Sequence, residues 1–196
     1  MKKILNYTLR ITIYALLFVC AANMNCFAES NGAMRLGILP VFKAATVSAD
    51  LTLDDTEIAT SVIYAGMTNC ADFEILSRTD VDKLVQEHEL TATGLIDNST
   101  APAFGKMLGA EYLLITNVTG LSSRKKTASV VGAGSKNYIV TARMAGRIVE
   151  VESGRVVLAA TSSATSGNQD ESLEKAAENL VDKLLENLEQ KKRAKQ

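Results

Sequence analysis

The sequence predicts an α/β protein, a single domain in which helices flank a mixed sheet of about five strands. In the first half of the chain, apolar runs of strand length alternate with helical patterns, which is typical of parallel strands joined by helical crossovers. Two segments in which apolar and polar residues alternate are then joined by a glycine-containing turn, which indicates an antiparallel hairpin. A long amphipathic pattern closes the chain. The expected element order is β-α-β-α-α-β-β-β-α.

The segment that precedes this domain has the features of a secretory signal peptide. Three basic residues come before a mostly apolar run over residues 11–22, which is shorter than the ~20 residues of a spanning helix. Cys26 and Ala28 place small residues where signal peptidase reads the chain, so cleavage after Ala28 is expected to remove residues 1–28. An uncleaved membrane anchor is the alternative.

Composition narrows the function classes for the remaining residues, 29–196, which are enough for one domain with a sizeable core. The leader carries three of the 21 basic residues and no acidic one, so residues 29–196 contain 18 basic and 22 acidic residues. This mildly acidic balance argues against a general nucleic-acid binder. Only Cys70 remains of three cysteines, as either a buried unreactive thiol or the source of an intermolecular disulfide.

The first elements follow from apolar spacing and caps. Residues 35–42 are expected to form a strand with Pro40 near its end, where an edge or a bulge tolerates the missing N–H. A helix over residues 54–69, capped by Asp54 or Asp55, should bury one face. Its inward side chains are expected to be Ile58, Val62, Ile63 and Met67. Residues 73–77 form a short second strand.

Residues 78–120 read as helix, turn, short helix and buried strand. Thr79 is the expected cap of the first helix, whose apolar face comprises Val81, Leu84, Val85 and His88. The short helix should be capped by Ser99 or Thr100 and should end at Gly109 in the left-handed conformation. It carries Pro102 in its first turn and is expected to bury Phe104, Met107 and Leu108. Residues 111–118 then form an inner strand.

Residues 121–136 read as a loop, and residues 137–151 and 155–164 as a hairpin whose turn uses Gly154. One parity of the first arm is expected to be buried: Tyr138, Val140, Ala142, Met144 and Ile148. The alternate residues on the other side of the strand, which include Thr141, Arg143 and Arg147, should be exposed to solvent.

The final helix has the clearest periodicity of the chain. Its apolar stripe consists of Leu173, Ala176, Ala177, Leu180, Val181, Leu184, Leu185 and Leu188. Residues 170–172 are its expected caps, and residues 191–196 form a basic tail that suits the helix dipole. A helix laid along the sheet is the expected arrangement, and a coiled-coil or partner helix is the alternative.

Residues suited to catalysis or metal binding are few. His88 is the only histidine, and no Gly-x-Ser-x-Gly elbow or zinc ligand set accompanies it. The carboxylates of Asp54, Asp55 and Glu57 lie at an expected helix start, where they stabilise the helix dipole without a metal. The glycine loops at residues 120–127 and 132–137 lack glycines that phosphate binding needs. We therefore predict no enzymatic activity, no cofactor and no metal; the alternative is an enzyme that uses Asp97, His88 or a glycine loop.

Arg124, Lys125 and Lys126 form the candidate partner-contact site. They are expected at the basic tip of the loop over residues 121–136, where a protein partner or anionic lipid headgroups could bind. A solvated hairpin tip without a partner is the alternative.

Several ordered segments resemble the curli production component (CsgG) family. Gly-Lys-Met-Leu-Gly-Ala-Glu-Tyr-Leu-Leu at residues 105–114 is the most specific of them. The other segments that carry the resemblance are residues 36–42, 77–80, 87–90, 94–95 and 147–157. The whole resemblance covers roughly residues 34–188, nearly the entire chain after the leader.

This resemblance implies a periplasmic protein, outer-membrane associated in some relatives, that acts through envelope protein partners in assembly or secretion. Family pores insert two membrane hairpins, but residues 122–136 are short for two spanning strands, and residues 162–168 lead straight into the last helix. The chain therefore resembles a short member without these insertions. Relatives are often lipid-anchored, yet neither Cys20 nor Cys26 follows a small residue, which favours a soluble exported protein.

Two further functions are compatible with the sequence. One is an accessory that docks on a penicillin-binding protein and regulates peptidoglycan synthesis. The other is a homo-oligomeric ring or an adhesin-linked subunit, for which sheet edges near Pro40 or along the strand with Tyr138 could serve.

Overall fold

A computed structural model describes residues 33–44, 47, 51–87, 100–126 and 137–194, and every structural statement below concerns these residues. From Met34 onward the chain forms one compact unit. The leader with Ala28 lies outside the described residues. So do His88, Asp97 and most of the glycine loops, and the predictions about these positions stay predictions.

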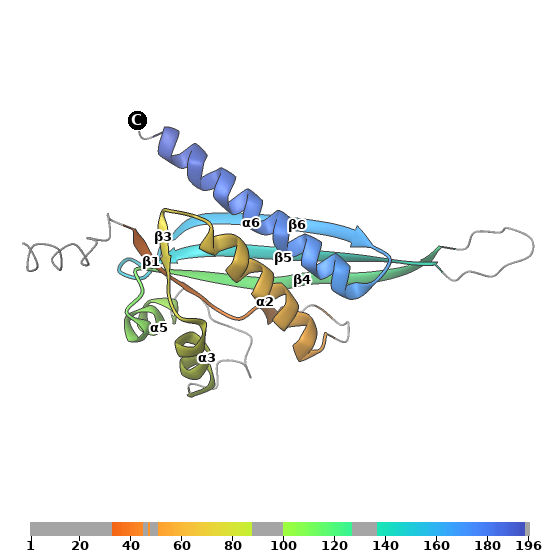
Figure 1. The fold of residues 1–196 in the computed structure, drawn as a ribbon, viewed down its shortest axis with the longest axis horizontal. Coiled ribbons are helices and arrows are strands. Elements are labelled where there is room, and N and C mark those ends of the chain that lie inside the picture. Colours follow the sequence, from red (N-terminus) through yellow and green to blue (C-terminus); the bar gives the residue numbers. More distant parts are fainter. Residues whose placement is uncertain (1–32, 45–46, 48–50, 88–99, 127–136, 195–196) are drawn as a thin grey trace, which may run out of the picture. The chain divides into compact units, whose positions relative to one another are not determined.

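The sheet is mixed and has six strands (Figure 1). β1 (Met34–Ile38) pairs in parallel with β3 (Phe73–Ile75) on one side and with β4 (Tyr112–Lys126) on the other. The next two strands, β5 (Asn137–Glu150) and β6 (Val156–Ser166), continue the sheet as antiparallel neighbours. The order is β3-β1-β4-β5-β6, and the two-residue β2 (Phe42–Lys43) also pairs with β4.

Four helices complete the described fold. α2 (Leu53–Thr68) and α6 (Gln169–Arg193) pack together against one face of the sheet. α3 (Arg78–Glu87) and α5 (Ala101–Leu108) pack against the other face (Figure 1). The expected α/β class and element order are confirmed, and β2 is the one addition.

The larger core lies between the sheet and the helices α2 and α6. Its fully buried side chains from the sheet include Leu36, Ile38, Leu114, Met144 and Ile148. Those from the helices include Ile63, Met67, Leu173, Leu180 and Leu184. Each large apolar side chain buried in this way contributes about 1.5–3 kcal/mol, so this layer dominates the stability of the domain.

A smaller core lies under α3 and α5, against the first residues of β4 and the last residues of β5. It contains Leu39, Val81, Val85, Phe104, Leu113, Ile115, Val149 and Val151. α5 approaches the sheet closely at Gly105, because a Cβ there would come within 2.3 Å of Val151 Cγ2. The small core thus covers only one end of its sheet face.

Both glycine predictions that depend on a left-handed backbone are confirmed. Gly109 ends α5 with φ = 67°, and Gly154 turns the β5–β6 hairpin with φ = 68°. The stripe of the last helix is also confirmed, since all its predicted members are buried except Leu185, which is half-buried. The basic residues 191–193 extend the last turn of α6 rather than forming a separate tail.

The expected helix caps are partly wrong. α2 is capped by Thr52, whose hydroxyl accepts from the Asp55 N–H while the Asp55 carboxylate accepts from the Thr52 N–H. α6 is capped by Asn168 and not by residues 170–172, which lie in its first turn. α3 begins at Arg78, so Thr79 lies inside it.

Two further expectations are wrong. The predicted first strand divides into β1 and β2, because Pro40 has no N–H for a continuous ladder and falls between them. Met107, which was expected to be buried, is 52% exposed. The short helix α5 packs against the sheet through Ala101, Phe104 and Gly105, and Met107 lies on a different side of the helix.

Candidate interaction surface

The predicted partner-contact residues lie at the end of a two-stranded ribbon. β4 continues to Lys126 and pairs with the first residues of β5, so that Arg124 faces Ile139 and Lys125 faces Tyr138. The last β6 partner of β5 is Ser166, opposite Val140. Among the described strands, β4 and β5 therefore continue alone beyond this point, and we call residues 124–126 and 137–139 the ribbon.

The expectation of a loop from residue 121 is wrong for residues 121–126. Ser122, Ser123 and Arg124 are exposed, so their stretch of β4 lacks the apolar alternation that identifies a strand in a sequence. Pairing with β5 supplies the order instead. A register shift between Val118 and Gly120 marks where β4 leaves the apolar part of the sheet.

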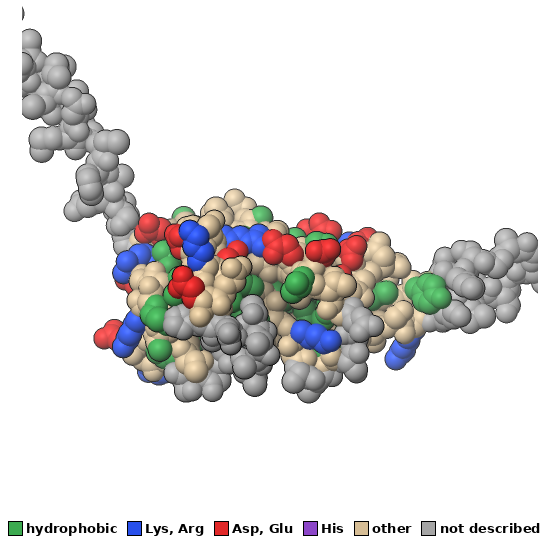
Figure 2. Space-filling model, turned by 90° about the horizontal axis from the view of Figure 1, so that it is seen from below, with side chains coloured by type: hydrophobic (Ala, Val, Ile, Leu, Met, Phe, Trp, Pro, Cys, Tyr) green, Lys and Arg blue, Asp and Glu red, His purple; other side chains and the backbone are tan. Residues whose placement is uncertain are grey.

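The ribbon combines an aromatic and a cationic side chain at its end. The expectation that Tyr138 is buried is wrong: it is 45% exposed, because it lies beyond the last residue of β5 that pairs with β6. Arg124 on β4 is exposed as well, and the register places it on the other face of the ribbon. Figure 2 shows hydrophobic and basic side chains together at this end of the molecule. Tyr and Arg are enriched at protein interfaces because each offers a large contact area and directed donors.

The second candidate surface is the sheet face opposite α2 and α6. Residues paired directly across strands share a face, so the register places Ile115, Arg147 and Ala159 in one row. The next rows contain Asn117, Ala145 and Thr161, then Gly120, Arg143 and Ser163, then Ser122, Thr141 and Thr165. α3 and α5 cover the opposite end of this face. We call these four rows the open face, apart from Ile115, which is buried in the small core.

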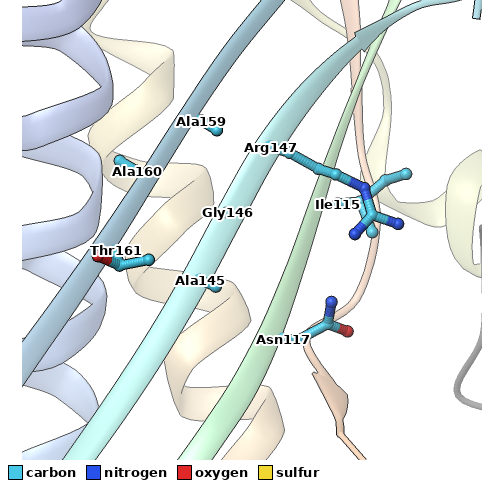
Figure 3. A pocket seen from close by; sticks show the side chains of 8 residues that line it. All are labelled: Ile115, Asn117, Ala145, Gly146, Arg147, Ala159, Ala160 and Thr161. Atoms are coloured by element: carbon cyan, nitrogen blue, oxygen red, sulfur yellow. The ribbon is translucent and has the colours of Figure 1, made fainter. Parts of the chain in front are cut away.

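A shallow hollow of about 370 Å³ lies on the open face (Figure 3). Arg147 extends from β5 toward Ile115 and Asn117 of β4, and the small side chains of Ala145, Ala159 and Thr161 leave the floor low. None of the eight residues that line the hollow is acidic, a histidine or a cysteine. The hollow thus offers donors and a flat apolar floor, but it lacks a nucleophile paired with a base.

The charge of the open face is positive. Its rows carry Arg143 and Arg147 and no carboxylate, and Arg124 continues the same face onto the ribbon. Such a surface suits a partner with an acidic or carbonyl-rich contact region, because guanidinium groups donate hydrogen bonds in a fixed fork.

Other titratable groups in the described part of the chain have structural roles. Burial raises the pKa of the Tyr64 hydroxyl, which donates to the Ile38 carbonyl at 2.9 Å. Burial also raises the pKa of the half-buried Cys70 thiol, and the Asp72 carboxylate adds to this shift. A thiol with a raised pKa is a poor nucleophile, which favours the unreactive thiol among the two interpretations of Cys70.

Asp55 is the most buried charged group and joins two helices. Its carboxylate accepts from the Thr52 N–H at 2.7 Å, from the Thr52 hydroxyl at 2.8 Å and from Gln169 Nε2 of α6 at 2.9 Å. Burial acts to raise its pKa, but these hydrogen bonds outweigh that effect, and the pKa lies below its ordinary value. The carboxylate is fully used in holding the starts of α2 and α6.

No group of three or more His, Cys, Asp or Glu side chains that could hold a metal ion occurs within the described ranges. Of the helices described, none is both long and apolar enough to cross a membrane. Sequence reasoning named Arg124, Lys125 and Lys126 of the ribbon as a candidate contact site, but it did not identify the open face. The sequence signal for this face was the set of alternate, solvent-facing residues between 141 and 147. These residues were predicted to be exposed but were not interpreted as a binding surface.

The fold and these surfaces define a single-domain α/β protein with a mixed sheet. The helices α2 and α6 cover one side of the sheet, the other side carries the open face, and β4 and β5 continue as the ribbon. The chain belongs to the curli production assembly/transport component CsgG family, whose model matches residues 40–194. The family expected from the ordered segments is thereby confirmed. α6 begins at Gln169, directly after β6 ends at Ser166, so no second hairpin is inserted there.

Several solved structures are similar to this chain at low sequence identity. Lipoprotein GNA1162 from Neisseria meningitidis aligns with a TM-score of 0.52 at 12% identity, covering 82% of this chain and 99% of that one. The LpoB C-terminal domain from Salmonella enterica aligns at 0.45 and 14% identity, covering 73% and 90%. A PelC dodecamer from Paraburkholderia phytofirmans aligns at 0.42 and 19% identity, covering 78% and 87%. No curated protein sequence matches.

Proposed function

We propose that this protein is an exported, non-enzymatic component of the bacterial envelope that acts through protein–protein contacts in assembly or secretion. The observation that carries the proposal is the open face: three strands present small side chains and two arginines, with no acid, base or nucleophile arranged around the hollow. Membership of a family named for assembly and transport supports the same role.

The ribbon and the open face are the proposed contact surfaces. Arg124, Arg143 and Arg147 give one continuous basic face, and Tyr138 adds an exposed aromatic side chain on the opposite face of the ribbon. A partner with an acidic strand or helix would gain charge-assisted hydrogen bonds here without burying an unpaired carboxylate of this chain. A periplasmic location, association with the outer membrane and self-assembly into an oligomer belong to the same proposal.

Site-specific photo-crosslinking in cells that produce the full chain tests the proposal. A photoreactive amino acid replaces Tyr138 in one variant and Thr161 in another, and the control variant carries it at Glu178 on the exposed side of α6. We expect specific crosslinks from the first two positions, which mass spectrometry identifies as envelope assembly or secretion proteins, or as a second copy of this chain.

The other outcomes separate the alternatives. Capture of a penicillin-binding protein from Tyr138 or Thr161 would move the function to control of peptidoglycan synthesis while keeping both surfaces. Crosslinks from Glu178 alone, or a small-molecule substrate turned over by the purified chain, would overturn the proposed contact surfaces and the non-enzymatic role.

A further inference from the structure

β6 is an edge strand with no protection in its own sequence. It runs for 11 residues, pairs only with β5 among the described strands, and contains no charged residue, proline or glycine. A strand edge of this length and composition is a template for adding another strand, because its outward N–H and C=O groups have no partner strand.

One row of α6 hydrogen-bonds along this edge. Side-chain nitrogens at every fourth helix position donate to the carbonyl oxygen of every second strand residue. The four hydrogen bonds are Asn179 Nδ2 to Ser163 at 3.4 Å, Lys183 Nζ to Thr161 at 2.9 Å, Asn187 Nδ2 to Ala159 at 3.1 Å, and Lys191 Nζ to Val157 at 2.8 Å. Figure 1 shows α6 lying along β6.

The two spacings match. Four residues of an α-helix advance about 6 Å, and two residues of a β-strand advance about 6.6 Å. Because α6 runs antiparallel to β6, each successive helix turn reaches the next outward carbonyl. The row therefore continues for more than three turns of the helix, from Asn179 to Lys191.

We propose that Asn179, Lys183, Asn187 and Lys191 form an edge guard that keeps β6 from pairing with a strand of a second copy of this chain. The guard occupies the acceptors that an added strand would need. Its two lysines also place positive charge where the lysines of a second copy would come, so edge-to-edge approach is repelled. The assignment goes beyond the proposed function and does not depend on it.

The opposite edge of the sheet supports this interpretation by contrast. β3 has only three residues, one of which is the exposed Glu74, so its length and charge already limit pairing. β6 has neither feature, and it is the edge that α6 covers with donors.

Replacing the donors tests the guard. The full chain with Lys183→Ala, Asn187→Ala and Lys191→Ala is compared with a control that carries Glu178→Ala, Asp182→Ala and Glu186→Ala on the exposed side of the same helix. Alanine favours a helix, so both variants should keep α6. A second guard variant, Lys183→Met with Lys191→Met, removes the lysine donors and keeps the apolar stems.

Two readouts are combined: sedimentation, and hydrogen exchange at the amides of Ala159, Thr161 and Ser163. These amides face outward with their carbonyls, because the N–H and C=O of a strand residue point to the same side. We expect the guard variants, relative to the unmodified chain, to form a larger species in which these amides exchange roughly tenfold more slowly. The control should resemble the unmodified chain.

Guard variants that keep the sedimentation coefficient of the unmodified chain, with equally fast exchange at the three amides, would overturn the proposal. So would a larger species in which these amides stay unprotected, because association would then use another surface. Lys183→Arg with Lys191→Arg retains the donors and should behave as the unmodified chain does.

Discussion

The two faces of strands β4, β5 and β6 differ in side-chain size, polarity and cover. Toward α2 and α6 the central strand presents Ala142, Met144 and Ile148, all buried. Toward the other side it presents Thr141, Arg143 and Arg147, which are exposed or half-buried. The same backbone therefore serves stability on one side and leaves the other side available for contact.

This difference separates two kinds of substitution. On the covered face, a change in side-chain volume meets a packed layer and costs folding free energy. On the open face, the same change meets solvent and should alter binding alone.

Leu180→Ala should have the largest effect. Leu180 is fully buried, and its side chain packs over Gly146, where an added Cβ would lie 3.1 Å from Leu180 Cδ2. The truncation leaves a cavity and should lower the free energy of unfolding by about 2–5 kcal/mol. Chemical denaturation measures the change, and a loss below 1 kcal/mol would show that this layer is not the core.

Asp55→Asn should reduce stability by about 1–3 kcal/mol at neutral pH, because an amide cannot replace a carboxylate that accepts three hydrogen bonds. The pKa of Asp55 lies below its ordinary 3.8, so the native state favours the charged form. Its contribution is present above pH 3.8 and is lost as the pH falls through the lower, folded-state pKa.

The stability difference between the unmodified chain and Asp55→Asn should therefore be constant near neutral pH and shrink below pH 3.8. Denaturation curves over a pH series measure it. A difference that grows on acidification would contradict the assigned role of the carboxylate.

Gly66→Ala should destabilise the protein although alanine favours helices. A Cβ at position 66 would come within 2.8 Å of Val181 Cγ1, and a β-branched side chain cannot rotate away easily. The strain of about 1–3 kcal/mol exceeds the roughly 1 kcal/mol gained in helix propensity. Thermal unfolding of the single variant and of Gly66→Ala with Val181→Ala measures the coupling, and the double variant should recover part of the loss.

Arg143→Ser and Thr161→Arg on the open face should change the free energy of unfolding by no more than about 0.5 kcal/mol each. Both side chains are exposed, and no described helix packs on them. Chemical denaturation again provides the measurement. A loss as large as that expected for Leu180→Ala would mean that the open face belongs to the core.

The sequence predicted the covered face much better than the open one. The apolar stripe of α6 repeats over more than four turns of helix and can be recognised without any tertiary information. The left-handed Gly109 and Gly154 were equally readable, because few other residues adopt that backbone. Burial and backbone geometry leave a pattern in a single chain.

The polar features were harder to predict for physical reasons. The end of β4 is exposed, so its order comes from pairing with β5, a contact distant in sequence. The Asn and Lys row of α6 repeats every four residues, yet any solvated helix face could look the same. Only the register of β6 shows that this row meets a strand edge. The capping box of Thr52 and Asp55, in contrast, could be recognised in the sequence from its three-residue spacing. Asp54 or Asp55 was instead expected to be the N-cap of α2.

The central claim is that the open face and the ribbon bind partners while contributing little to folding. A variant with Tyr138→Ser, Arg143→Ser and Thr161→Arg tests it directly, with Glu178→Ser on α6 as the matched control. Each is produced as the full chain, and partner recovery after in-cell crosslinking is measured beside the unfolding midpoint. We predict that the surface variant loses its partners at an unchanged midpoint, and that the control keeps both. Full partner recovery by the surface variant would contradict the account.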